Sequence, residues 1–517
     1  MKMKKALLLV FIQFFILYSL LIGKCFSLTI EEGFYSQGLT YAVSGQFREA
    51  KQEFDKAFQA NPYFIYIQPS LKLAQDAIER KVDKKTAIGM FRAYKLVFEG
   101  RKKQALVEFS KILFKDQRYI DAYMGRGNLY SSMGRLNRAI EDFTKVIETQ
   151  PSFIDAYINR GLVYDRQGKF DDAIADFNKA IEINPNYYDA YVNRGITNRH
   201  KGSLNDAIYD FNSAIDINPS HYDAYENRGV AYREKEDIGK AILDFTRAIE
   251  LRPQYAKAYL KRGNTRVLKG QYTEAIRDYE LAIELAPDFD EAYFNRGTTY
   301  LSQGKSAEAI VDFDKVIELS PNYYEAYNNR GIAHRYMGDH DSAIADFQKT
   351  AQINPKYFEA YNNLGVAYRY KGDFESAIAS FTKAIQLRPQ YAKAYLNRGN
   401  SFVNQDKIEE ALQDYNKAIE IDPKMGDVYF NRGTIYLNLD KFDLAILDFD
   451  RAIRSQPDYS PAYFNKAFSY DKVGFIDDAI QAYQVFLQHA KPEDREYIAR
   501  ANDRIKKLKK IRKSDGF

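Results

Sequence analysis

The chain has 517 residues, of which 45% are hydrophobic and 15% aromatic. This length exceeds what one compact core normally holds, and the composition excludes a disordered chain. The 75 basic and 70 acidic residues leave a net charge of +5, which gives no global signal for nucleic acid. The single cysteine, Cys25, excludes a disulfide framework and a cysteine metal site, and the scattered histidines lack ligand spacing.

The N-terminus has the pattern of an export signal. MKMKK is basic, and residues 6–23 form an uncharged apolar run. The pattern predicts a signal peptide over residues 1–27, cleaved after Ser27. An uncleaved anchor over residues 6–23 is the alternative, because such a run can just span a bilayer. A lipid-anchored Cys25 is disfavoured, because Lys24 stands where a small residue is needed. Both main alternatives predict an exported protein of the periplasm or cell envelope.

The prolines reveal an internal repeat. Ten of the fourteen, from Pro151 to Pro457, recur every 34 residues. With proline at position 32 of a unit, eleven regular units fill residues 120–493. Two weaker units occupy residues 31–64 and 86–119. The segment between them, residues 65–85, is predicted to form one extra helix.

Each unit is predicted to form two helices. Position 4 is always Tyr in the regular units, position 8 is Gly or Ala, position 20 is Ala and position 24 is aromatic. Small residues at positions 8 and 20 allow the two helices to approach closely, and proline ends the second helix. One pair cannot bury its apolar face alone, so stacked neighbours must supply the core. The sequence therefore predicts an all-α solenoid.

This pattern resembles the tetratricopeptide repeat, and the similarity covers thirteen units between residues 31 and 493. In the unit from residue 154, the matching residues are Gly161, Tyr164, Ala173, Phe177, Ala180 and Pro185. The resemblance implies a right-handed superhelix whose first helices line the concave face. Position 11 departs from the pattern in Asn198, Arg266 and His334, so looser packing is expected there.

The C-terminal segment, residues 494–517, follows the repeats. It carries an apolar stripe and many Lys and Arg residues. A basic capping helix over the last repeat is predicted, since a terminal repeat needs a polar outer cover. The alternative is that its basic tip binds anionic lipid or nucleic acid.

An Arg at position 7 accompanies an Asp at position 23. Nine regular units carry both, from Arg126 with Asp142 to Arg432 with Asp448. The unit at 358–391 lacks both together, with Leu364 and Ser380 in their places. This co-occurrence predicts an ion pair between the two helices of each unit, worth about 0–1 kcal/mol if it is exposed. The arginine is therefore interpreted as structural.

An asparagine recurs at position 6, as in EAYNNRG and DAYVNRG. A primary amide offers a donor and an acceptor, which suits pairing with an extended peptide backbone. The row resembles the asparagine ladder in the repeat domain of O-linked N-acetylglucosamine transferases. The alternative is that these amides bridge adjacent repeats and serve only stability. The predicted ladder consists of Asn159, Asn193, Asn227, Asn295, Asn329, Asn363, Asn397, Asn431 and Asn465.

Other side chains of the first helices are predicted to give this surface its selectivity. They are Arg199, Arg233, Arg335 and Arg369 at position 12 and Phe294 and Phe430 at position 5. The decapeptide LRPQYAKAYL occurs at 251–260 and again at 387–396, which indicates a duplicated block of four repeats. No position-5 lysine is present in the regular units, so the carboxylate clamp of some chaperone-binding relatives is not expected.

These patterns predict a non-enzymatic scaffold of the cell envelope that binds a protein or an extended peptide. The alternative is a substrate-presenting or regulatory subunit of a separately encoded enzyme, such as a glycosyltransferase. An enzyme is not predicted, because no catalytic triad, nucleotide loop or metal set is found. No cofactor, metal or nucleic-acid partner is expected. Membrane contact is expected only through an uncleaved N-terminus or the basic C-terminal tail.

Overall fold

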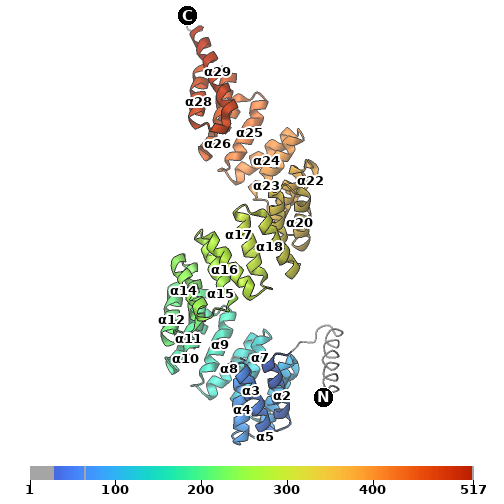
Figure 1. The fold of residues 1–517 in the computed structure, drawn as a ribbon, viewed down its shortest axis with the longest axis vertical. Coiled ribbons are helices and arrows are strands. Elements are labelled where there is room, and N and C mark those ends of the chain that lie inside the picture. Colours follow the sequence, from blue (N-terminus) through green and yellow to red (C-terminus); the bar gives the residue numbers. More distant parts are fainter. Residues whose placement is uncertain (1–27, 63, 65, 515–517) are drawn as a thin grey trace, which may run out of the picture. The chain divides into compact units, whose positions relative to one another are not determined.

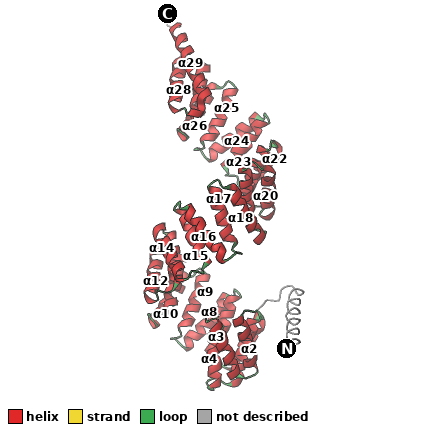
Figure 2. Ribbon diagram, viewed as in Figure 1, coloured by secondary structure: helices red, strands yellow, loops and turns green. Residues whose placement is uncertain are grey.

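The computed structural model describes residues 28–514, except residues 63 and 65. This part of the chain consists of helices and loops and contains no strand (Figure 2). No helix among the described residues is long and apolar enough to cross a membrane. The predicted signal peptide or anchor, residues 1–27, lies outside the described residues.

The N-terminal part holds the two weaker units and the segment between them (Figure 1). The first two helices pair with each other, as do the last two, and the middle helix contacts both pairs. The helices are α2 (Ile30–Val43), α3 (Phe47–Ala60), α4 (Ile67–Ile78), α5 (Lys84–Phe98) and α6 (Lys102–Lys115).

The regular repeats each form one helix pair, and the all-α solenoid fold is confirmed. The first helices are α7 (Ile120–Ser132), α9 (Ile154–Arg166), α11 (Tyr188–His200), α13 (Tyr222–Glu234), α15 (Ala256–Leu268), α17 (Asp290–Ser302), α19 (Tyr324–Tyr336), α21 (Phe358–Tyr370), α23 (Ala392–Asn404), α25 (Gly426–Asn438) and α27 (Ser460–Val473). The second helices are α8 (Leu136–Thr149), α10 (Phe170–Ile183), α12 (Leu204–Ile217), α14 (Ile238–Leu251), α16 (Tyr272–Leu285), α18 (Ser306–Leu319), α20 (His340–Ile353), α22 (Phe374–Leu387), α24 (Ile408–Ile421), α26 (Phe442–Ser455) and α28 (Ile476–His489).

Close approach within a pair depends on the glycine at position 8. In the repeat from residue 154, a Cβ added to Gly161 would lie 2.7 Å from the Phe177 ring. The alanine at position 20, Ala173, is fully buried beside it. The ring at position 24 therefore fills the space that a larger side chain at position 8 would need.

The turn between the two helices bends at position 15. Most repeats place a glycine there with positive φ, such as Gly304 at +74° and Gly372 at +83°. Glu236, Asp406 and Asp440 adopt the same left-handed conformation without being glycine. An L side chain in this region costs free energy, so these three turns are strained.

The predicted ion pair within each repeat is confirmed. In all nine repeats with both residues, the arginine forms a two-pronged contact with the aspartate, as Arg296 does with Asp312 at 2.6 and 2.9 Å. The Asp312 side chain is only 3% exposed and that of Arg296 18% exposed. The estimate for an exposed pair therefore does not apply, because removing one partner would leave a buried charge.

The same arginine also reaches the preceding repeat, which the sequence pattern did not predict. Arg160 Nη1 donates to Thr144 Oγ1 at 2.9 Å, and Arg398 Nη1 donates to Thr382 Oγ1 at 2.9 Å. Arg330 Nη1 lies 2.5 Å from Asp314. Position 7 thus links three helices: its own, its partner in the repeat and the second helix of the repeat before.

The chain divides into two compact units, one ending at Arg252 and the other beginning at Pro253. The second unit ends in a 3₁₀ turn, η1 (Pro492–Asp494), and the long helix α29 (Arg495–Ser514). The apolar stripe of α29, including Ala501, Ile505 and Leu508, is buried against the last repeat. Arg504 also pairs with Asp471 of α27 at 2.5 Å. This helix therefore covers the apolar surface of the terminal repeat.

Candidate functional site: the asparagine row

The asparagine row lies on the first helices. The first helices of successive repeats contact one another, for example α9 with α11 and α19 with α21. Among the described residues, the second helices of successive repeats do not come as close to one another. The first helices thus form the inner side of each compact unit. Eight of the nine asparagines are half-buried there, and Asn397 is 8% exposed.

Many of these amides bridge adjacent repeats. Three donate through Nδ2 to an asparagine at position 9 of the preceding repeat: Asn159 to Asn128 at 3.2 Å, Asn295 to Asn264 at 3.0 Å and Asn431 to Asn400 at 2.9 Å. Asn264 and Asn400 each also accept a hydrogen bond from the tyrosine hydroxyl at position 24 of their own repeat, Tyr279 and Tyr415.

A second bridge uses position 5 of the preceding repeat. Asn363 donates to Asn328 Oδ1, and Asn397 donates to Asn362 Oδ1, both at 3.0 Å. These partners are the extra asparagines of the Asn-Asn pairs in the repeats from residues 324 and 358. The adjacent asparagines visible in the sequence were the signal that could have revealed this bridge.

The remaining members of the row differ. Asn329 lies 3.5 Å from Thr298 Oγ1, and Asn227 Nδ2 donates to the carbonyl of Asp223 in its own helix. The amides of Asn193 and Asn465 have no hydrogen bond with any described residue. The row is therefore a set of amides in several local environments.

Bridging leaves part of each amide available. Asn295 uses one of its two N–H donors, and its Oδ1 accepts no hydrogen bond within the described chain. The same holds for Asn431. A second donor and an acceptor therefore remain, which is the pair that a peptide backbone needs. The bridge fixes the orientation of the amide, so the structural and the peptide-binding interpretations are compatible.

The four arginines predicted to give selectivity are not equivalent. Arg199 forms an ion pair with Glu234 at 2.8 Å. Arg233, Arg335 and Arg369 are half-buried on the first helices and form no ion pair with a described residue. Of the four arginines, only Arg199 therefore has an ion-pair partner among the described residues.

The two phenylalanines predicted to line the surface are packed against other rings. Phe294 stacks on Tyr323 with ring centroids 4.9 Å apart and touches Phe313. Phe430 meets Tyr459 edge-on at 4.9 Å. Each ring contacts the tyrosine at position 34, which precedes the next repeat. Both phenylalanines therefore contribute to packing between successive repeats.

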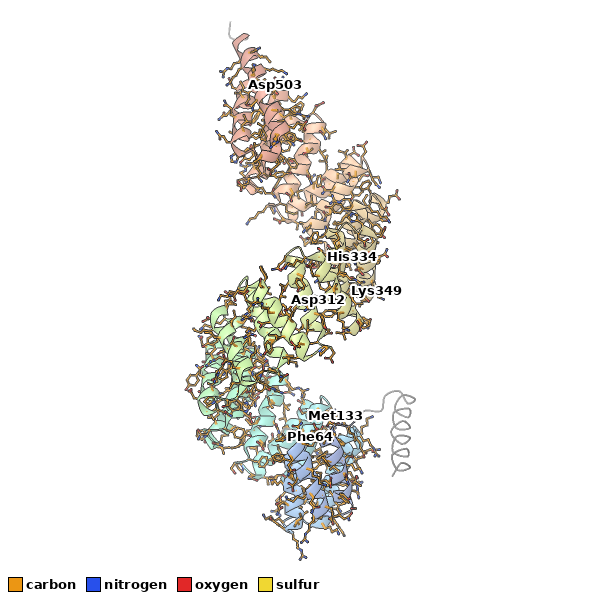
Figure 3. The ribbon with its side chains drawn as sticks, viewed as in Figure 1. Phe64, Met133, Asp312, His334, Lys349 and Asp503 are labelled. Atoms are coloured by element: carbon orange, nitrogen blue, oxygen red, sulfur yellow. The ribbon has the colours of Figure 1, made fainter. Side chains whose placement is uncertain are left out.

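The three polar residues at position 11, where looser packing is expected, each lie close to an aspartate. Asn198 donates to Asp210 at 2.9 Å, and Arg266 lies 2.8 Å from Asp278. His334, which is labelled in Figure 3, has its Nε2 4.0 Å from a carboxylate oxygen of Asp346. In all three repeats, the polar side chain approaches the buried aspartate of the ion pair. The tyrosine that occupies position 11 in most of the regular repeats gives no sign of this role.

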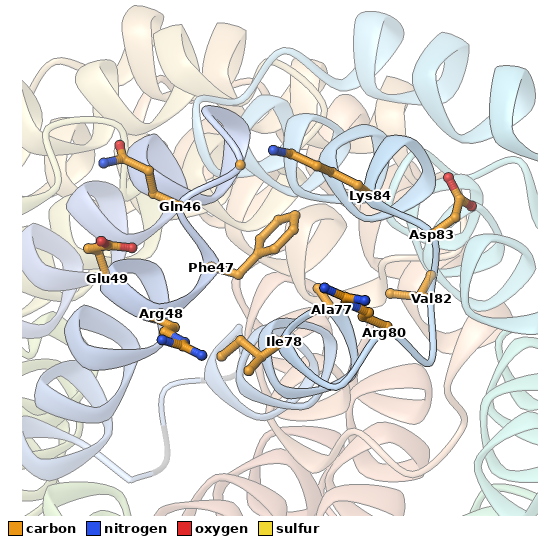
Figure 4. A pocket seen from close by; sticks show the side chains of 11 residues that line it. Gln46, Phe47, Arg48, Glu49, Ala77, Ile78, Arg80, Val82, Asp83 and Lys84 are labelled. Atoms are coloured by element: carbon orange, nitrogen blue, oxygen red, sulfur yellow. The ribbon is translucent and has the colours of Figure 1, made fainter.

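A separate pocket of about 670 Å³ lies beside the extra helix (Figure 4). It is formed by α3, α4 and the start of α5, with Phe47 and Ile78 among its lining side chains. Arg48, Glu49 and Lys84 give it charges of both signs. Within the described part of the chain, no cluster of His, Cys, Asp or Glu is arranged to hold a metal ion.

Comparison with protein families identifies the repeats. Models described as tetratricopeptide repeat match residues 120–153, 154–187, 177–209, 222–255, 290–323, 322–390, 392–425 and 426–459, and a TPR repeat model matches residues 263–304. The chain belongs to the tetratricopeptide repeat family. A search of the curated proteins found no significant match.

Several solved structures are similar to parts of this tetratricopeptide repeat chain. MamA is 28% identical over 33% of this chain and 92% of its own, with a TM-score of 0.31. YrrB, described as a TPR protein with an unusual peptide-binding site, is 27% identical over 36% of this chain and 95% of its own, with a TM-score of 0.32. The Cut9–Hcn1 structure is 16% identical over 86% of this chain and 97% of its own, with a TM-score of 0.41.

Proposed function

We propose that this protein is a non-enzymatic scaffold that holds an extended segment of a partner protein along its inner face. The observation that supports this is the row of half-buried amides. Each bridged amide is held by a neighbouring repeat and keeps an acceptor and a second donor. Fixed amides recognise a backbone without the entropic cost of ordering free side chains on binding.

The proposal includes export to the cell envelope. Its support is the sequence of residues 1–27, which combines a basic start with an apolar run. Fractionation of cells, with N-terminal sequencing of the mature protein, tests this part. Recovery of a mature chain beginning at Leu28 from the periplasm would support it, and recovery of the intact chain from the cytoplasm would overturn it.

Cross-linking pull-down from native cells tests the binding face. The variant changes Asn295, Asn329, Asn363 and Asn397 to Ala. The matched control changes one second-helix lysine in each of the same repeats to Ala: Lys315, Lys349, Lys383 and Lys417. Three of these lysines bond only within their own helix, for example Lys315 to Glu318 at 2.8 Å.

We expect the asparagine variant to keep its helical circular dichroism and lose its partners, while the lysine variant keeps them. Loss of partners in both variants, or in neither, would contradict the assignment to the inner face. A partner that brings an enzymatic activity with it would favour the alternative role, in which this chain presents substrates to a separately encoded enzyme.

A further inference from the structure

The four-repeat duplication places Arg199 and Arg335 at equivalent positions, 136 residues apart. In the first copy, Arg199 Nη1 lies 2.8 Å from a carboxylate oxygen of Glu234. Its Nη2 lies 3.3 Å from His200, whose Nδ1 lies 3.0 Å from Asp165. In the first copy, the chain itself therefore supplies one carboxylate in direct contact with the arginine and a second that contacts the neighbouring His200.

The second copy keeps the arginine and loses both carboxylates. The residues 136 positions after Asp165, His200 and Glu234 are Leu301, Tyr336 and Tyr370. Arg335 forms no ion pair with any residue that the structure describes. Two acids that follow Arg335 closely in sequence have other partners: Asp341 pairs with Lys371 at 2.5 Å, and Asp339 accepts a hydrogen bond from the Ser342 backbone N–H.

Tyrosine rings hold the guanidinium groups in this second copy. Arg335 lies 4.9 Å from the Tyr336 ring, and in the next repeat Arg369 lies 5.6 Å from the Tyr370 ring. The two tyrosines are 64% and 60% exposed. A guanidinium resting on a ring keeps its N–H edge free for a planar, two-pronged contact with a carboxylate.

We propose that Arg335 and Arg369 bind a carboxylate of the partner segment, in the place that Glu234 fills in the first copy. This inference rests on the proposed function of the inner face. The two arginines occupy the same position of α19 and α21, which contact each other. The occupant is an aspartate, a glutamate or a free C-terminus, all of which present the same planar anion.

The duplication supplies matched variants. Tyr370→Glu restores to the second copy the internal carboxylate of the first, and should occupy Arg335 without removing it. Arg335→Gln removes the charge directly. Glu234→Tyr makes the opposite change and should open an equivalent site at Arg199 in the first copy.

The experiment selects binders for the purified full chain from a synthetic library of random ten-residue peptides with free C-termini. A selected peptide is then compared with versions that carry glutamine in place of its acid or an amide at its C-terminus. We expect neutralising the acid to weaken binding by roughly tenfold in the wild type. It should have little effect in Arg335→Gln and Tyr370→Glu, whereas Glu234→Tyr should gain affinity for acidic peptides.

The outcomes separate this inference from the proposed function. The carboxylate site would be overturned if the selected peptides bind without needing an acid. It would also be overturned if neutralising the acid weakens binding to the Arg335 and Tyr370 variants as much as to the wild type. Either result would leave the proposed binding of a segment along the inner face intact. A library that yields no binder whose affinity depends on the asparagine row would overturn both.

Discussion

Two repeats of the same compact unit bury the same position in different ways. In the repeat at 290–323, Arg296 and Asp312 form a buried ion pair. In the repeat at 358–391, Leu364 packs against Ile344 and Phe347 of the preceding repeat, and the Ser380 hydroxyl donates to a carbonyl of its own helix at 2.7 Å. Both solutions leave no buried charge unpaired. The ion pair and the apolar contact are therefore interchangeable only when both partners change together.

The largest effect is expected from replacing only one partner of the ion pair between Arg296 and Asp312. Arg296→Leu leaves Asp312 buried without its partner and should lower the free energy of unfolding by about 3–5 kcal/mol. Urea denaturation followed by circular dichroism measures this. The double variant Arg296→Leu with Asp312→Ser, which copies the natural repeat, should recover most of the loss. A double variant as unstable as the single one would show that the two solutions are not interchangeable.

Replacing the glycine at position 8 should be more destabilising where the aromatic ring at position 24 lies closer. A Cβ added to Gly365 would lie 2.7 Å from the Phe381 ring, and one added to Gly297 would lie 3.0 Å from the Phe313 ring. Both alanine variants should lose stability, by about 1–3 kcal/mol, with the larger loss at Gly365. Denaturation of the two purified variants side by side measures the difference. Equal losses would mean that the distance to the ring does not set the cost of the added methyl group.

The Arg296→Leu variant should recover in acid. Burial raises the pKa of Asp312, and the hydrogen bonds from Arg296 oppose this shift. Without Arg296 the pKa of Asp312 should rise further, so the folded state binds a proton that the unfolded state releases. The free energy of unfolding then increases as pH falls through this window. The deficit relative to the wild type should therefore be smaller near about pH 5 than near about pH 7, by roughly 1 kcal/mol for each unit of pKa.

The smallest effect on stability is expected at position 15, the turn residue, which is glycine in both of the compared repeats. Glu236 adopts φ +64° at the equivalent position of another repeat. Glu236→Gly removes the strain of that conformation and should raise the free energy of unfolding by about 1 kcal/mol. Thermal denaturation measures this, and a less stable variant would show that the glutamate side chain contributes contacts that outweigh the strain.

The features repeated within one unit could be predicted from the sequence. The period of 34, the contact between Gly161 and Phe177, and the pairing of Arg160 with Asp176 all follow from residues that recur together. Each of these concerns the two helices of one repeat, whose separation in sequence is fixed. Their geometry is therefore nearly the same in every copy.

The contacts between repeats could not be predicted in the same way. The bond from Arg160 to Thr144 and the bridge from Asn295 to Asn264 depend on how one repeat sits on the next. The acceptor lies at position 9 of the preceding repeat in three copies and at position 5 in two, so bridging could be stated from the sequence only as an alternative, without its partners. The envelope location and the peptide-binding role of the row stay predictions.

A photo-cross-linker placed at Thr298 tests whether a partner segment lies along the asparagine row. Thr298 is exposed on the first helix α17, next to Asn329, whereas Val311, at 68% exposure, lies on the second helix of the same repeat and serves as the control position. The account predicts that Thr298 captures one defined segment of a partner protein in native cells, identified by mass spectrometry of the cross-linked peptides. Capture should fail at Val311 and in the four-asparagine variant. Equal capture at both positions, or capture at Thr298 that does not depend on the asparagines, would contradict the account.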